Sequence, residues 1–210
     1  MALTTGCIAP LYTWDTHTSS APSPVGFDAA ELAREPVATL GVVAPAALQG
    51  LGPAVSQALA RALADASPPI RGATAIETLS TLNERGLASE YAGLMAEFGR
   101  SGILERERLG RIAAVLGSRY VLLPGLGGFD DTVVDRFEIT GFKLVRNRVV
   151  VLRLWLQVWD ARSGRIAGEA SGEVAAVSAL LTVGRTIPLD AIAEKLWRSM
   201  LTDDLLAANR

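Results

Sequence analysis

Three carboxylates stand close together in the sequence: Asp130, Asp131 and Asp135 follow the glycine-rich segment 125–128. A flexible glycine loop that delivers acids could coordinate a hard cation, so a metal-dependent hydrolase is one function to weigh. The spacing lacks the alternate ligands and the downstream glutamate of a calcium-binding hand, and neighbouring acids in a polar loop are usually solvated turn residues. We therefore expect no metal site here, and the hydrolase stays an alternative.

Other reactive side chains are scarce. The sequence contains one histidine, His17, and one cysteine, Cys7. His17 lies in a Ser/Thr/Pro-rich stretch, which argues against a His-dependent catalytic triad, and one histidine cannot form a clustered His metal site. The glycines at 125–128 are not followed by the lysine and serine or threonine of a phosphate loop. We expect no catalytic residue and no cofactor.

Cys7 has a particular context. The segment Leu3-Thr4-Thr5-Gly6-Cys7 resembles the end of a bacterial lipoprotein signal peptide, in which small residues precede the cysteine that becomes acylated. A stretch rich in Ser, Thr and Pro follows at residues 16–24, as expected of a tether. We expect Cys7 to be lipidated and to hold the chain at a membrane; the alternative is an ordinary cysteine in a tail.

The run Val149–Trp159 carries the most informative pattern. Side chains of a strand alternate between its faces, so Val150, Leu152, Leu154, Leu156 and Val158 form a plain core face. The other face includes Arg153, Trp155, Gln157 and Trp159. Because Trp and Arg are enriched at protein interfaces, these four residues predict a surface for a partner or a second subunit. The alternative is that a loop, the tail or a helix of the same chain covers them.

Composition bounds the remaining function classes. The 210 residues are 50% hydrophobic and 20% charged, with a net charge of −2. This composition is typical of a globular protein. The net charge is slightly negative and would not attract nucleic acid, so no nucleic-acid partner is expected. The longest apolar candidate is 149–159, well short of the roughly 18 to 20 residues that a spanning helix needs.

Periodicity predicts the elements that would position these residues. A strand is expected at 37–43, helices at about 53–65, from 75, around 87–98 and around 104–116, and a strand from 120. Strands at 137–145, 149–159 and 166–177 follow, and Pro188 opens a final helix. The sequence therefore predicts a flexible tail at 1–36 and one α/β domain at 37–210, with a mixed, largely antiparallel sheet flanked by helices.

Several of these pieces resemble a group of envelope lipoproteins in their order. The pieces are 37–43, Leu82–Leu87 with Tyr91, Leu109–Leu122, and the strand Leu154–Asp160 with Ser163-Gly164. The group includes the curli-secretion lipoprotein, lipoprotein activators of penicillin-binding proteins, a ring-forming lipoprotein of exopolysaccharide export and the amino-terminal domain of the Tol-Pal β-propeller protein. The resemblance covers about residues 37–200.

This resemblance implies export past the inner membrane, no cofactor, no reaction, and work by assembly. The expected protein is a periplasm-facing lipoprotein anchored to the outer membrane, acting as a scaffold or docking factor that binds itself or another envelope protein. A membrane-spanning pore is less expected, because charged residues fall on both faces of 131–145. A small-ligand-binding module remains a further alternative.

Overall fold

A six-stranded sheet organises the computed structural model, which describes residues 12–21, 29–138, 143–179 and 188–206. Its strands are β1 (Tyr12–Ala21), β2 (Val37–Thr39), β3 (Gly72–Ala73), β4 (Tyr120–Glu138), β5 (Lys143–Asp160) and β6 (Arg165–Ala179). They lie in the order β1-β6-β5-β4-β2-β3. The first four in this order are antiparallel, while β2 pairs in parallel with β4 and β3. The predicted mixed, largely antiparallel sheet is confirmed.

The helices begin and end largely where local sequence signals place them. They are α1 (Ala29–Arg34), the 3₁₀ turn η1 (Ala46–Leu51), α2 (Gly52–Asp65), α3 (Ala75–Glu84), α4 (Ala88–Ser101), α5 (Arg106–Leu116), α6 (Leu189–Ser199) and the π-helical turn η2 (Met200–Leu205). Thr74 and Glu77 form the expected capping box of α3. Gly117 ends α5 with a φ of 63°, which favours glycine.

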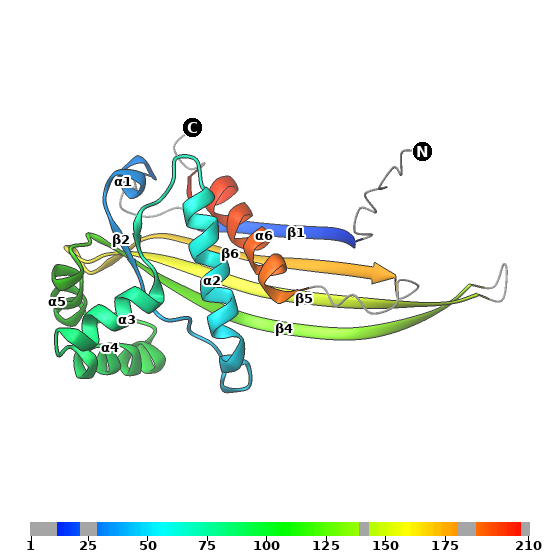
Figure 1. The fold of residues 1–210 in the computed structure, drawn as a ribbon, viewed down its shortest axis with the longest axis horizontal. Helices are drawn as coiled ribbons and strands as arrows, with labels where there is room; N and C mark the ends of the chain where they lie inside the picture. Colours follow the sequence, from blue (N-terminus) through cyan, green and yellow to red (C-terminus); the bar gives the residue numbers. More distant parts are fainter. Residues whose placement is uncertain (1–11, 22–28, 139–142, 180–187, 207–210) are drawn as a thin grey trace, which may run out of the picture.

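Two hydrophobic cores lie on the two faces of the sheet. Helices α2 and α6 lie across one face (Figure 1), where they pack on the core residues of β5. Helices α3, α4 and α5 gather at one end of the molecule (Figure 1), and the second core lies between them and the other face. At the opposite end of the molecule, β4 and β5 run well past the helices (Figure 1).

The described part of the expected tail is not a free tether. Residues 12–21 form β1, which pairs with β6 over its whole length. A Ser- and Thr-rich segment can be ordered without apolar side chains of its own, because its backbone hydrogen-bonds to the neighbouring strand at the sheet edge. Threonine is also a residue type that is enriched in strands. The short helix expected at 28–34 is present as α1.

The predicted division of the β-rich segment was wrong at one point. The strand expected at 137–145 is instead the paired ends of β4 and β5, in which Phe137 lies opposite Leu144. The glycines expected to form a loop at 125–128 lie inside β4, where a register shift falls between Leu126 and Gly128. Glycine in a strand often marks such a bulge, a signal that the sequence carried.

Among the described helices, none combines the length and the apolar character that crossing a bilayer requires.

Candidate protein-binding surface

Strand β5 has the two faces that its alternation predicts. Val150, Leu152, Leu154, Leu156 and Val158 are each at most 2% exposed and belong to the core under α2 and α6. The opposite face is covered unevenly, because α4 and α5 reach only the end of the strand near Trp159.

Trp159 lies at the covered end. It is 3% exposed and belongs to the second core with Leu109 and Ile112 of α5. Its indole Nε1 donates to Gln157 Oε1 at 3.1 Å, and Gln157 Nε2 donates to Glu169 Oε2 at 3.2 Å. Helices of the same chain therefore cover this part of the predicted interface, and Trp159 contributes to packing rather than to exposed area.

Trp155 lies at the boundary of the covered region and is half-buried. Its ring packs on Phe98 of α4 at 6.2 Å between centroids, and it also lies directly against Gly125 of β4. A Cβ atom added at Gly125 would stand 1.8 Å from Trp155 Cε2, so only glycine leaves room for the indole. Gly125 thus makes room for Trp155 and fixes the position of its ring.

Arg153 is exposed and bridges acids on both neighbouring strands. Its Nε donates to Glu173 Oε2 at 2.5 Å and its Nη1 to Asp130 Oδ2 at 3.0 Å. These two hydrogen bonds, first that to Asp130, raise the pKa of the guanidinium above its ordinary value. Asp130 is therefore engaged by an arginine across the sheet.

The neighbouring Asp131 points to the other face, since consecutive strand residues alternate. Its carboxylate accepts from Arg148 Nε at 2.7 Å and from the same guanidinium's Nη2. The hydrogen bonds to Arg148 hold the pKa of Asp131 below its usual value. Nothing is described of the Asp135 side chain, and within the described ranges no three potential metal ligands gather. The alternation separates Asp130 and Asp131, which the proposed hydrolase would need on one side.

Beyond Trp155, the sheet surface opposite α2 and α6 carries valines and an alanine that belong to neither described core. We call it the open face and define it by residues that share this side through the strand register: Thr132, Val134, Val149, Val151, Arg153, Trp155, Glu173, Ala175 and Val177. Val134 is 42% exposed, and Val149, Val151, Ala175 and Val177 are half-buried. The valines form a strip that ends at the Arg153 ion pairs.

A hollow of about 440 Å³ lies at that end of the strip. Trp155 and Arg153 line it. Three small residues, Ser19, Gly127 and Ser171, also line it, and their short side chains leave the space between the larger ones unfilled. The hydroxyls of Ser19 and Ser171 lie 3.1 Å apart. A shallow recess beside a half-buried tryptophan is the kind of feature that receives an anchoring side chain at a protein interface.

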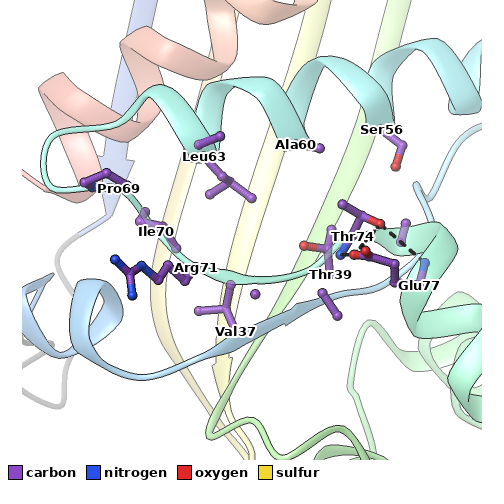
Figure 2. Close-up of a pocket in the computed structure, with 14 residues that line it drawn as sticks. Val37, Thr39, Ser56, Ala60, Leu63, Pro69, Ile70, Arg71, Thr74 and Glu77 are labelled. Atoms are coloured by element: carbon purple, nitrogen blue, oxygen red, sulfur yellow. Dashed lines mark hydrogen bonds between the residues drawn. The ribbon is translucent and has the colours of Figure 1, made fainter.

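A second hollow, of about 450 Å³, lies between α2, α3 and the β3 edge (Figure 2). Small side chains such as Ala60 and Ala64 line much of it. At the start of α3, Glu77 Oε2 accepts from the Thr74 N–H at 2.8 Å and from its hydroxyl at 2.9 Å. The helix end that would otherwise attract an anion is thus capped by the chain's own carboxylate.

A polar cluster that the sequence did not signal secures α1 to the end of the sheet. Glu31 Oε2 accepts from the Tyr120 hydroxyl at 2.6 Å and from Arg119 Nη1 at 2.8 Å. The hydrogen bond from Tyr120 is the largest influence that lowers the pKa of Glu31. Its partners come from sequence positions almost ninety residues away, so no local motif could reveal the cluster.

The predicted lipidation site, Cys7, lies outside the described residues.

Comparison with known proteins gives distant structural similarities only. No family model matches the chain, and no curated protein matches it significantly. A PelC dodecamer from Paraburkholderia phytofirmans is similar over 90% of this chain and 96% of its own, at 16% identity and a TM-score of 0.48. Lipoprotein GNA1162 from Neisseria meningitidis is similar over 81% and 99%, at 11% identity and a TM-score of 0.44. With TM-scores below 0.5, these similarities assign neither a function nor an assembly to this chain.

Proposed function

We propose that this chain is a non-enzymatic lipoprotein of the bacterial envelope that works as a scaffold or docking factor, and that its open face binds another protein. The observation that carries the proposal is the valine strip beside Trp155. Apolar side chains on a sheet surface that no described helix covers mark a protein-interaction site.

The composition of the open face suits a protein partner. Val149, Val151 and Val177 offer apolar area, and Trp155 offers a partly exposed aromatic edge next to a recess. Arg153, paired with acids on either side, supplies a polar border to the strip. An apolar centre with aromatic and arginine residues at its border is the usual anatomy of a protein interface.

The envelope location and the lipid anchor rest on the sequence around Cys7 and on the resemblance to envelope lipoproteins. In this proposal the acyl chain holds the protein at the outer membrane, and the folded part faces the periplasm. Mass spectrometry of the mature amino terminus tests the anchor: we expect an acylated Cys7, and an unmodified terminus beginning at Met1 would contradict it.

The open face is tested by introducing a charge into the strip. Val151→Lys, made in the full chain in its native host, should weaken association by about tenfold or more, because an unpaired charge would enter an apolar contact. The measurement is the fraction of the chain that migrates on native gels in complexes larger than those that the purified chain forms alone.

Val133→Lys is the matched control. Val133 lies on β4, is 57% exposed and points away from the open face, so the same change there should leave the complexes intact. Circular dichroism confirms that both variants fold. Complexes that survive Val151→Lys as well as they survive Val133→Lys would refute the open face as the binding surface.

A further inference from the structure

The two edges of the sheet differ in a way that matters for assembly. At one edge, β3 has only two residues. At the other, β1 presents ten residues that pair with β6 without a register shift. Proteins usually blunt exposed edges with short strands, bulges, proline or lysine. The β3 edge uses the first of these devices, whereas β1 contains no proline, no lysine and no bulge.

A regular edge of this length is a template for another strand. Every second residue of β1 directs its backbone N–H and C=O away from β6, and those groups must meet equivalent groups on a partner. When two copies of β1 pair antiparallel, residues whose backbone groups point away from β6 lie opposite residues of the same kind. Because such residues alternate along the strand, the numbers of two opposed residues are both even or both odd, and their sum is even. The twofold axis must then pass through a residue pair.

Side-chain chemistry selects among the allowed registers. An axis through Asp15 would place two carboxylates opposite each other, which is unfavourable. An axis through Thr16 places Asp15 opposite His17 of the partner copy twice, and the two groups are compatible because His17 Nε2 already lies 3.2 Å from Asp15 Oδ1 within one chain. Like charges meet nowhere in this register.

The geometry points to a second copy of this chain as the occupant of the β1 edge, joined antiparallel about a twofold axis through Thr16. The two sheets become one twelve-stranded sheet, and the open faces of both copies share one side of it. The functional part of this inference rests on the proposed scaffold function, because the dimer would present two open faces at once. It uses a different surface from the open face.

Disulfide trapping tests the pairing and its register. In the full chain with Cys7→Ser, Thr16→Cys should give a covalent dimer under mild oxidation. Opposed residues have Cα atoms about 4.5 to 5.5 Å apart, within disulfide range. Trp14→Cys and Thr18→Cys are matched controls on the same side of β1; they oppose each other rather than themselves, so either one alone should stay unlinked. Preferential linking at 14 or 18, or no linking at 16, would overturn the inference.

Sedimentation velocity tests the charge pairing without a thiol. His17→Asp should weaken dimerisation about threefold or more, because it places carboxylates opposite each other twice. The exchange Asp15→His with His17→Asp should restore it. Failure of the exchange to rescue would overturn this register.

The two proposals fail separately. If position 16 does not link but Val151→Lys still dissolves the native complexes, the strand pairing is refuted and the scaffold function stands. If position 16 links while Val151→Lys changes nothing, the open face is refuted and the dimer stands.

Discussion

Trp197 offers the sharpest test of how α6 is held to the body of the protein. The residue is fully buried in the core between α6, α2 and the sheet, and its indole Nε1 donates to the Val55 carbonyl of α2 at 3.1 Å. Trp197→Phe keeps an aromatic ring in the core but removes the donor and part of the volume. The change therefore measures one interhelical hydrogen bond together with a modest loss of packing.

The magnitude follows from these two contributions. A hydrogen bond is worth about 1 kcal/mol net, and the Val55 carbonyl keeps its own helical partner, so no acceptor is left bare. The lost ring atoms correspond to one or two buried methylenes, at about 0.8 kcal/mol each. We expect Trp197→Phe to lower the free energy of unfolding by about 2 to 3 kcal/mol, and Trp197→Ala by about 3 to 5 kcal/mol.

Chemical denaturation followed by circular dichroism gives these values without relying on tryptophan emission. With a urea slope of about 2 kcal/mol/M, Trp197→Phe should move the midpoint by about 1 M. Trp14→Phe is the matched control, because Trp14 is 37% exposed and lies on the edge strand β1. If Trp197→Phe destabilises no more than Trp14→Phe, the description of the α2–α6 contact is refuted.

Two further predictions concern contacts made by residues in the first part of β4. Gly125→Ala should destabilise the protein by about 1 to 3 kcal/mol and shift tryptophan fluorescence, because the added carbon meets Trp155; Gly127→Ala should do neither, since its nearest neighbour would be 3.6 Å away. The pKa of Glu31 is lowered mainly by the Tyr120 hydroxyl, so its stabilising effect is present above the ordinary value of about 4.3 and lost as pH falls through the lowered one. The stability gap between wild type and Glu31→Gln in urea should therefore shrink on acidification, and a constant gap would contradict this.

Local signals were enough to predict most helices and the fold class. The capping box at Thr74 and the glycine at 117 act within a few residues of the helix that they bound, so the sequence displays them directly. The same holds for the core face of β5, where strict alternation over 149–159 matches the observed burial.

The remaining features depend on contacts that are distant in sequence. β1 looks like a tether until β6 supplies its hydrogen-bond partners, more than 140 residues later. Trp159 looks like an interface residue until α5 covers it. Acids 130 and 131 look like a cluster until the pleat separates them and arginines of β5 pair with each. In each case tertiary packing decides what a short pattern leaves open.

The paired strands β4 and β5 also constrain how this protein can change its length over evolution. β4 has 19 residues and lies against β5 through most of its length, so at roughly 3.3 Å per residue it spans about 60 Å. Insertion of a single residue would reverse every side chain beyond it, moving the valines to the wrong side of the sheet. Natural relatives in which the β4–β5 pair is longer or shorter should therefore differ by even numbers of residues in both strands, unless a compensating bulge accompanies the change.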